Sequence, residues 1–178
     1  SGKTAAFGIG LLDKIVPGQY VTQALVLCPT RELADQVSKE LRRLARFTQN
    51  IKILTLCGGQ PIGPQLDSLV HPPHIVVGTP GRIQEHLRKQ TLSLDALRIL
   101  VLDEADRMLD MGFSDDIDEV IRYTPPRRQT LLFSATYPEG IARISARVQQ
   151  DPLDVEIAAE AEQTTIEQIF VETTREKR

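Results

Sequence analysis

Residues 99–106, Ile-Leu-Val-Leu-Asp-Glu-Ala-Asp, decide how this chain folds. The apolar run Ile99–Leu102 ends abruptly at the acidic pair Asp103 and Glu104. A short apolar run without alternation is typical of a strand that is covered on both faces in a parallel sheet. We therefore expect Ile99–Leu102 to be a buried strand, with the acidic residues at its carboxyl end.

The same arrangement, an apolar run followed at once by small or polar residues, recurs elsewhere in the chain. The other runs are Ala24–Cys28, Ile51–Cys57, Ile75–Val77 and Leu131–Phe133. Helical patterns separate them: Ala5–Val16, Arg31–Phe47, and segments that start at Ser114 and Pro138. Strands that alternate with helices need crossover connections. The sequence therefore predicts an α/β domain with a parallel sheet and helices on both faces.

Composition excludes several classes of protein. The 178 residues are 41% hydrophobic and 25% charged, which suffices for the core of one domain. The net charge is −3, so any site for a polyanion must be local. Aromatic residues make up only 4% and Trp is absent, which argues against a module that reads RNA by base stacking.

The pattern of apolar residues and cysteines indicates a cytoplasmic protein without a membrane partner. No apolar run approaches the roughly 18 residues of a membrane span, and no signal peptide is recognised at the start. Cys28 and Cys57 lie in apolar runs outside any CxxC spacing. We expect both to be buried thiols in a reducing compartment.

Ser1-Gly2-Lys3-Thr4 matches the end of a phosphate-binding loop, GxxxxGK[ST], at the start of a helical segment. In such loops the backbone N–H groups and the helix dipole face the anion, and the lysine reaches the β- and γ-phosphates. The threonine hydroxyl can bind Mg²⁺. The first glycine of the pattern and its preceding strand are missing, so the tetrapeptide alone also fits an ordinary helix cap.

Asp103 and Glu104 favour the phosphate interpretation. A strand that ends in Asp supplies a carboxylate for Mg²⁺, and an adjacent Glu can orient the attacking water. The alternative is that Asp103, Glu104 and Asp106 only begin a helix, where acidic side chains complement the dipole. Three acidic residues within four repel one another, and a divalent cation would relieve that repulsion. We therefore favour a metal–phosphate site.

Small and polar clusters follow the other strands, and in a parallel sheet they meet at one edge, where ligands bind. Arg31 and Arg82 lie beside Pro, Thr or Gly, where they could close on phosphates. The alternative is that both are solvated arginines in capped turns. Gly58-Gly59 fits the close approach of a phosphodiester backbone, and fits an ordinary tight turn as well.

Taken in order, these clusters resemble the motifs of the DEAD-box ATP-dependent RNA helicases. The matching segments are Ser1–Thr4, Pro29–Ala34, Gly58-Gly59, Thr79–Arg82, Asp103–Asp106 and Ser134–Thr136. The resemblance covers essentially the entire chain, and Glu104–Phe113 strengthens it. It implies that residues 1–157 form the first of two RecA-like domains, with a three-layer α/β/α fold that lacks the strand before the phosphate loop.

The resemblance implies ATP and Mg²⁺ as cofactors and RNA as a partner. Ser1, Gly2, Lys3 and Thr4 would bind the ATP phosphates, with Thr4 and Asp103 on Mg²⁺. Glu104 would orient the hydrolytic water, with Asp103 and Lys3 completing the catalytic set. The residues implied to line the RNA backbone path are Thr30, Arg31, Gly58, Gly59, Thr79, Gly81 and Arg82. Those implied to couple hydrolysis to strand separation are Asp106, Ser134 and Thr136.

Several parts of the family pattern are expected to lie outside this chain. They are the adenine-reading glutamine motif, the second RecA-like domain with its arginine fingers, and a C-terminal domain that targets ribosomal RNA. The resemblance thereby implies a role in ribosome assembly. We interpret 158–178 as a linker with the first strand of the second domain, Ile166–Val171. Without its neighbour, the strand Leu131–Phe133 is expected to have one side that is either unpaired or paired with a substitute.

Two alternatives to a helicase domain stay open. A non-catalytic module that binds nucleotide or RNA fits the chain itself, because phosphoryl transfer needs the arginine charge that it lacks. The second alternative is a DNA translocase with the same fold. It stays open because only a contact with the 2′-OH distinguishes RNA from DNA. The oligomeric state does not follow from the sequence.

Overall fold

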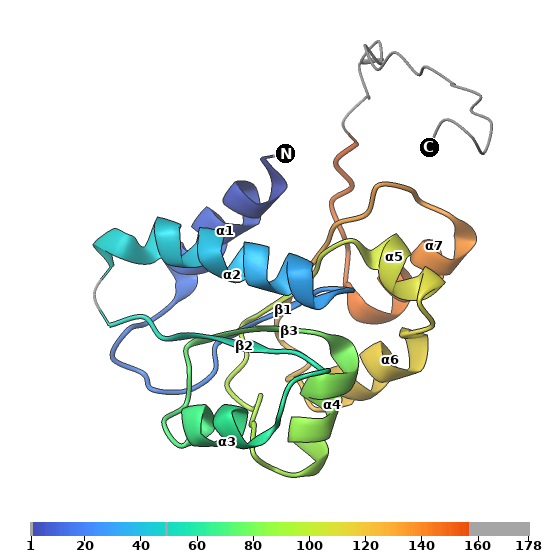
Figure 1. Ribbon diagram of the computed structural model, residues 1–178. Helices are drawn as coiled ribbons and strands as arrows, with labels where there is room; N and C mark the ends of the chain where they lie inside the picture. The colour runs from blue at the N-terminus through green and yellow to red at the C-terminus, as the bar shows by residue number, and fades with distance from the viewer. Residues whose placement is uncertain (1, 49, 157–178) are drawn as a thin grey trace, which may run out of the picture.

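The computed structural model describes residues 2–48 and 50–156, which contain one five-stranded parallel sheet (Figure 1). Its strands are β1 (Ala24–Leu27), β2 (Ile53–Leu56), β3 (Ile75–Gly78), β4 (Ile99–Leu102) and β5 (Gln129–Leu132). Their order across the sheet is β2-β3-β1-β4-β5. Each predicted apolar run coincides with or overlaps one of these strands, and the predicted α/β fold is confirmed.

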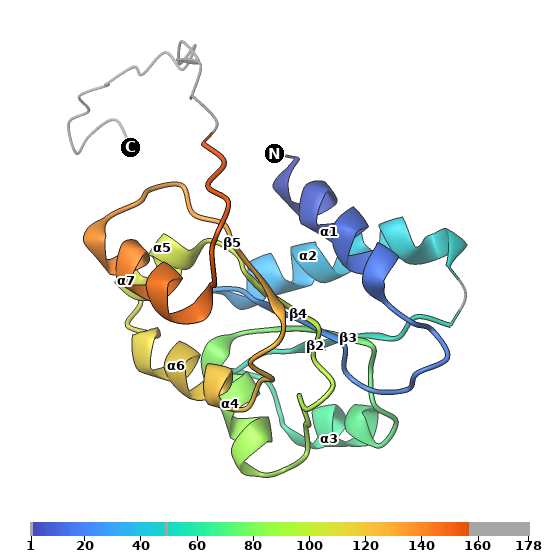
Figure 2. The same ribbon diagram turned by 180° about the vertical axis from the view of Figure 1, so that it is seen from behind.

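Helices cover both faces of the sheet (Figure 2). They are α1 (Lys3–Lys14), α2 (Arg31–Leu44) with the 3₁₀ turn η1 (Ala45–Phe47), α3 (Gly63–Leu69), α4 (Pro80–Arg88), α5 (Ala105–Asp110), α6 (Ser114–Arg122) and α7 (Glu139–Val148). Helices α1 and α2 pack on one face, and α3 to α7 contribute their buried residues to the other. The three-layer arrangement is therefore present.

The strands divide their side chains between two hydrophobic clusters. In β1, Leu25 and Leu27 belong to the cluster under α3 to α7, whereas Ala24 and Val26 belong to the cluster under α1 and α2. All four residues are completely buried. Successive side chains of a strand point to opposite faces, so a strand covered on both sides must be apolar throughout. This is why unbroken apolar runs predicted the strands correctly.

β5 is an edge strand among the described residues, because it pairs with β4 alone. The sequence predicted this unpaired side. Phe133, just beyond β5, donates its N–H to the carbonyl oxygen of Leu102, and its ring lies 5.4 Å from that of Phe7 on α1. Helix α1 therefore packs beside the end of this edge strand. The predicted strand Ile166–Val171 lies outside the described residues.

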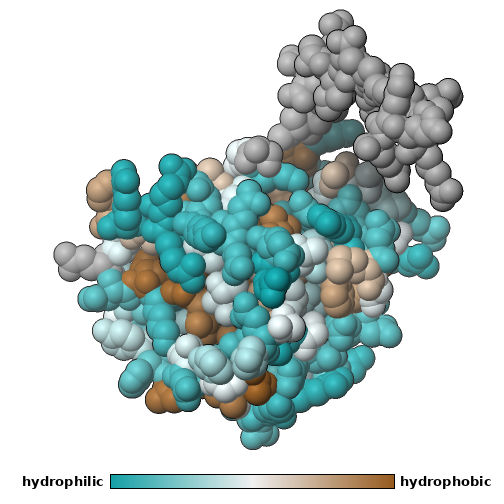
Figure 3. Space-filling view, viewed as in Figure 1, coloured by the Kyte–Doolittle hydropathy of each residue, from teal (hydrophilic) through white to brown (hydrophobic). Residues whose placement is uncertain are grey.

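Both cysteines are buried free thiols, as the sequence predicted. Burial raises the pKa of Cys57 to about 11 and also raises the pKa of Cys28. On the surface seen in Figure 3, hydrophobic residues form small separate areas among polar ones. None of the helices within 2–48 and 50–156 has the length and apolar character needed to span a membrane.

Candidate nucleotide and nucleic-acid site

The carboxyl ends of the strands form the edge at which the predicted site residues gather. The strands are in register, so Leu27 lies beside both Gly78 and Leu102. Backbone hydrogen bonds continue past the strand ends, from Cys28 N to Gly78 O at 2.9 Å and from Asp103 N to Leu27 O at 3.0 Å. The loops after neighbouring strands therefore start from fixed positions along one edge.

Asp103 is the most buried of the acidic residues at this edge, with 4% of its surface exposed. Its desolvation raises the pKa of the carboxyl group, and the charge of Lys3 on α1 acts in the opposite direction. A desolvated carboxylate is stabilised by nearby positive charge, which a bound divalent cation would supply. The charge of Lys3 thus acts on Asp103, although the two residues are 100 positions apart in the sequence.

Glu104 occupies the left-handed region of backbone space, with φ of 52° and ψ of 54°. Side chains other than glycine rarely adopt this conformation, and such strain gathers at functional sites. The turn is held because Ala105 N donates to Phe133 O at 2.9 Å. This turn leaves the carboxylate of Asp103 buried and that of Glu104 partly exposed. The Nη1 atom of Arg107 lies 3.4 Å from Oε2 of Glu104. Two adjacent acids thereby receive two different environments.

The first turn of α1 can receive an anion. A helix leaves its first N–H groups without intrahelical acceptors. The N-cap residue Gly2 offers no side-chain hydrogen bond, and the first turn contains no acidic residue. Lys3 and Thr4 lie in this turn, so backbone N–H groups, an ammonium group and a hydroxyl share one place. Ser1, which the sequence assigned to the same loop, lies outside the described residues.

The donor set suits Mg²⁺ bound together with phosphates. The described residues contain no group of three or more His, Cys, Asp or Glu side chains that could hold a metal ion alone. Mg²⁺ is usually bound through one or two carboxylates, water and substrate phosphates, and seldom by an all-protein cage. Asp103 and the hydroxyl of Thr4 fit that requirement.

A groove of about 710 Å³ lies beside Thr4, between α1 and α2. Its lining is mixed in charge: Thr4, Ala5, Glu32, Asp35, Gln36, Lys39, Glu40 and Arg43. Neither Lys3 nor Asp103 contributes to it. Three carboxylates make this groove a poor receptor for phosphates, so we keep the phosphate site at the first turn of α1.

Asp106 connects α5 with the segment after β5. Its Oδ2 atom accepts hydrogen bonds from the backbone N–H and the hydroxyl of Thr136, both at 3.0 Å. Ser134 donates its hydroxyl proton to the carbonyl oxygen of Thr136 at 2.6 Å. Desolvation raises the pKa of Asp106, but the hydrogen bonds from Thr136 and Arg107 outweigh it and lower the pKa below its ordinary value. The three predicted coupling residues therefore form one bonded cluster.

Thr30 and Arg31 begin α2 at the end of β1. The Oγ1 atom of Thr30 accepts a hydrogen bond from Leu33 N at 3.2 Å, which is the N-cap geometry expected of Thr. Arg31 is exposed and its only ion pair is with the neighbouring Glu32 at 3.4 Å, among the described residues. Its guanidinium group is therefore available to a ligand.

The glycine loop after β2 lies against the start of α4. Gly58 N donates to Thr79 Oγ1 at 3.3 Å, and Gly59 has a φ of +73°, where glycine is favoured. Both glycines are exposed, with no atom within 4 Å of where a Cβ would lie. Gly81, in the first turn of α4, has the same open surroundings. The backbone of these residues is open to a ligand.

Arg82 differs from Arg31, although the sequence assigned both to the same path. Only 10% of its side chain is exposed. Its Nη2 atom donates to Gln60 O at 2.9 Å, and its Nε atom pairs with Glu85 at 3.0 Å. The remaining Nη1 atom is buried without a partner among the described residues. Arg82 therefore holds the glycine loop and keeps one unused donor.

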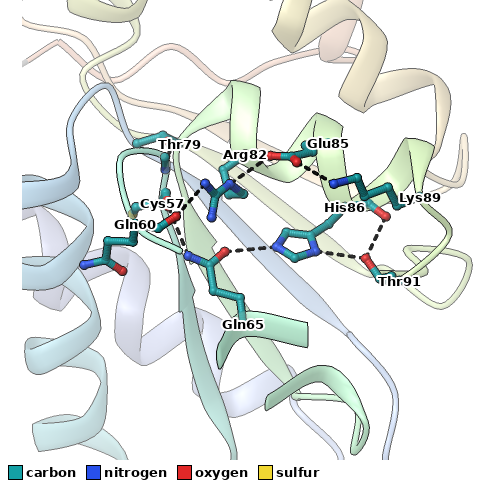
Figure 4. Close-up of polar contacts among 10 residues, drawn as sticks. Cys57, Gln60, Gln65, Thr79, Arg82, Glu85, His86, Lys89 and Thr91 are labelled. Atoms are coloured by element: carbon teal, nitrogen blue, oxygen red, sulfur yellow. Dashed lines mark hydrogen bonds and ion pairs between the residues drawn. The ribbon is translucent and has the colours of Figure 1, made fainter. Parts of the chain in front are cut away.

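Sequence reasoning missed two buried polar residues next to this loop, Gln65 and His86 (Figure 4). Gln65 comes from α3 and His86 from α4. No motif or spacing connects them, because they meet only after both helices pack against the loop.

A parallel α/β sheet whose carboxyl edge combines an anion-accepting helix N-terminus with a buried aspartate defines a nucleotide-binding domain of the RecA-like class. Within that class, the chain belongs to the DEAD/DEAH box helicase family, whose model matches residues 1–144.

Known relatives and structures agree with this assignment. The chain is 69% identical over 174 residues to the ATP-dependent RNA helicase DbpA of Escherichia coli K12, covering 98% of this chain and 38% of that protein. It is 49% identical to the ATP-dependent RNA helicase CshA of Listeria monocytogenes, covering 96% and 33%. A solved DEAD box protein from Methanococcus jannaschii superposes with a TM-score of 0.80 at 40% identity, covering 85% and 41%. The chain thus spans about a third to two fifths of the length of these relatives.

Proposed function

We propose that this chain is the ATP-binding core domain of an ATP-dependent RNA helicase, an enzyme that couples ATP hydrolysis to local unwinding of RNA duplexes. The observation that carries the proposal is the buried carboxylate of Asp103 at the end of β4, followed by Glu104 in a left-handed turn, with the charge of Lys3 in the first turn of α1 acting on Asp103. The relatives named as ATP-dependent RNA helicases support the same activity.

Each residue of the nucleotide site has its own task in this proposal. Lys3 and the first-turn N–H groups of α1 bind the β- and γ-phosphates. Thr4 and Asp103 hold Mg²⁺, which neutralises charge on the phosphates when it is bound. Glu104 holds and orients the attacking water. Its left-handed turn gives the strand end a second carboxylate, in surroundings that differ from those of Asp103.

The RNA path in this proposal follows the loops on the same edge, at Thr30, Arg31, Gly58, Gly59, Thr79, Gly81 and Arg82. Exposed glycine backbone and the free guanidinium of Arg31 suit phosphodiester groups, which bind without regard to base sequence. Arg82 contributes through the loop that it holds. Local donors of this kind reconcile RNA binding with the net charge of −3.

Coupling and partners complete the proposal. The cluster of Asp106, Ser134 and Thr136 joins the strand end that carries Asp103 to the edge strand β5. A shift at the nucleotide would reach the segment after β5 through such bonded contacts. A second RecA-like domain is proposed to supply the arginine charge for phosphoryl transfer. Ribosomal RNA as the target, ribosome assembly and a cytoplasmic location belong to the same proposal.

A nucleotide-binding measurement tests the phosphate site. We take the two-domain form, in which this chain is followed by the second RecA-like domain, and titrate it with a fluorescent ATP analogue and Mg²⁺. Lys3→Ala should weaken binding by about 10- to 100-fold, the range for losing a charge-assisted hydrogen bond. Lys14→Ala is the matched control, because Lys14 lies in the last turn of the same helix and bonds to Gln129. Equal affinities of the Lys3→Ala variant and the control would contradict the assignment.

A further inference from the structure

A chain of buried polar contacts runs beneath the glycine loop (Figure 4). Gln65 is 6% exposed and His86 is fully buried. The Nε2 atom of Gln65 donates to Cys57 O at 3.1 Å, and its Oε1 atom lies 3.0 Å from His86 Nε2. His86 Nδ1 lies 2.9 Å from Thr91 Oγ1. The contacts begin at the residue that directly precedes Gly58 and end in the turn after α4.

The directions of these hydrogen bonds follow from the acceptor at Cys57. A backbone carbonyl only accepts, so the amide nitrogen of Gln65 faces Cys57 and the amide oxygen faces the ring. His86 Nε2 must then carry a proton and donate to Gln65. The hydroxyl of Thr91 lies within hydrogen-bond distance of both His86 Nδ1, at 2.9 Å, and the carbonyl oxygen of His86, at 3.1 Å. A neutral ring has both nitrogens satisfied when the hydroxyl donates its one proton to Nδ1, and His86 O then keeps its bond from the N–H of Thr91.

The other end of the loop is held by a second set of contacts on α4. Arg82 donates to Gln60 O at 2.9 Å. Glu85 pairs with Arg82 at 3.0 Å and with Lys89 at 2.7 Å. The carbonyl groups on both sides of Gly58 and Gly59 are therefore fixed, while the two glycines themselves stay exposed.

Burying an amide and an imidazole costs free energy unless their hydrogen bonds are complete. Two apolar side chains would fill the same space without this requirement, but they would leave Cys57 O without its bond from Gln65. A fully satisfied buried network makes its surroundings rigid. A loop that is already ordered loses less conformational entropy when it binds a ligand.

We propose that Gln65 and His86 are positioning residues that hold the Gly58–Gly59 backbone in the conformation that receives an RNA phosphate. This inference rests on the proposed RNA-binding function. Neither side chain touches the RNA, because both are buried beneath the loop. They act through Cys57 O, and Arg82 acts on the same loop through Gln60 O.

Four variants test the proposal in the two-domain form. Gln65→Leu and His86→Leu remove the network, and His86→Gln retains a donor to Gln65. Gln65→Glu has nearly the same size and keeps the acceptor for His86, and its ionised form lacks the donor to Cys57. Gln65→Leu removes the donor without burying a carboxylate. Gln84→Leu is the control, since Gln84 lies on α4 but bonds to Glu119 on α6.

The first readout is amide hydrogen exchange at residues 58–60, followed by mass spectrometry without any RNA. We expect faster exchange in Gln65→Leu, Gln65→Glu and His86→Leu, and wild-type exchange in His86→Gln and Gln84→Leu. Unchanged exchange in both Gln65→Leu and Gln65→Glu would overturn the proposal. This readout does not depend on RNA binding, so it separates the inference from the proposed function.

The second readout is the affinity for a fluorescent single-stranded oligouridylate, with a non-hydrolysable ATP analogue present. We expect the three network variants to bind about tenfold more weakly, comparable to one lost buried hydrogen bond. The slope of log affinity against log salt should stay as in wild type, because no phosphate contact is lost. Affinity for the ATP analogue should also stay unchanged.

Three outcomes would each contradict a different part of these proposals. A loosened loop with unchanged RNA affinity would overturn the positioning role. Equal loss of RNA and nucleotide affinity would show that the network only supports the fold. Absence of RNA binding by the wild-type protein would overturn the proposed function itself.

Discussion

Asp106 and Thr136, which lie on different elements, are joined by two hydrogen bonds of 3.0 Å. Both come to one carboxylate oxygen, from the backbone N–H and from the hydroxyl of Thr136. The other oxygen, Oδ1, accepts from the N–H of Arg107 at 3.0 Å. A single side chain therefore fixes the loop after β5 to the helix that follows the acidic strand end.

Asp106→Ala should separate hydrolysis from unwinding. It removes charge-assisted bonds worth about 1.5–3 kcal/mol each, while Asp103 and Glu104 stay in place. In the two-domain form we expect the number of RNA duplexes unwound per ATP to fall by about tenfold or more. Asp110→Ala, an exposed position on the same helix, is the control. An unchanged ratio of unwinding to hydrolysis would contradict the coupling role.

Glu104→Gln should leave ATP binding nearly intact and slow turnover by at least about 10²-fold, because the amide no longer accepts a proton from water. Asp103→Asn provides the contrast, since losing a Mg²⁺ ligand should weaken the binding of ATP with Mg²⁺. Equilibrium titration and single-turnover hydrolysis measure the two effects separately. A Glu104→Gln variant that loses binding and turnover equally would show that the two roles are assigned wrongly.

Arg31→Ala should weaken RNA binding to a similar degree for every sequence, since phosphate contacts carry no sequence information. The salt-dependence slope should fall by about one unit or slightly less. Arg43→Ala is the control, because Arg43 lies on the same helix but is bound to Glu40 at 2.6 Å. Affinities measured at several salt concentrations give the slopes. If Arg31→Ala and wild type have the same slope, Arg31 is a solvated arginine in a capped turn.

His86 should make folding stability depend on pH between about pH 7 and 5. Desolvation lowers the pKa of His86, the charges of Arg82 and Lys89 lower it further, and Glu85 opposes them. As pH falls below the ordinary histidine pKa of about 6.5, His86 binds a proton in the unfolded chain but stays neutral in the folded chain. The stability contributed by neutral His86 is thus present above that pH and is lost below it.

Urea unfolding at pH 7.5 and 5.5 measures this effect. Wild type should lose more stability on acidification than His86→Gln, by at most about 1.4 kcal/mol for one pH unit below the unfolded pKa. The exposed His71 offers the matched control, His71→Gln, which should behave as wild type. Identical pH dependence of wild type and His86→Gln would show that His86 is readily protonated in the folded protein.

The strands and the longer amphipathic helices could be predicted because each leaves a local pattern. Ile99–Leu102 was assigned from its unbroken apolar character, and α2 from apolar residues at helical spacing. The short helix α3 escaped prediction, since Gly63–Leu69 opens with Gly and Pro and buries only Gln65 and Leu69. The segment has no apolar pattern at helical spacing. Its helix depends on tertiary packing against the sheet.

The candidate site also has parts that the sequence predicted and parts that it did not. That the polar clusters after the strands share one edge followed from the rule that ligands bind at the carboxyl ends of parallel strands. The different surroundings of Arg31 and Arg82 did not follow, because both stand in similar turns in the sequence. Burial of Arg82 depends on where Gln60 and Glu85 lie after folding. Contacts between separate helices leave no periodicity in a single sequence, and Gln65 with His86 is the clearest case.

The rate of ATP hydrolysis with single-stranded RNA, with single-stranded DNA of the same sequence, and without nucleic acid tests the central claim most directly. We predict that the two-domain form is stimulated by RNA and little by DNA, and that Glu104→Gln abolishes the stimulated rate. The 178-residue chain alone should show no RNA-stimulated hydrolysis, because the arginine charge from the second domain is missing. Equal stimulation by DNA would favour a DNA translocase. A two-domain form that binds ATP but never hydrolyses it faster with RNA would contradict the helicase assignment.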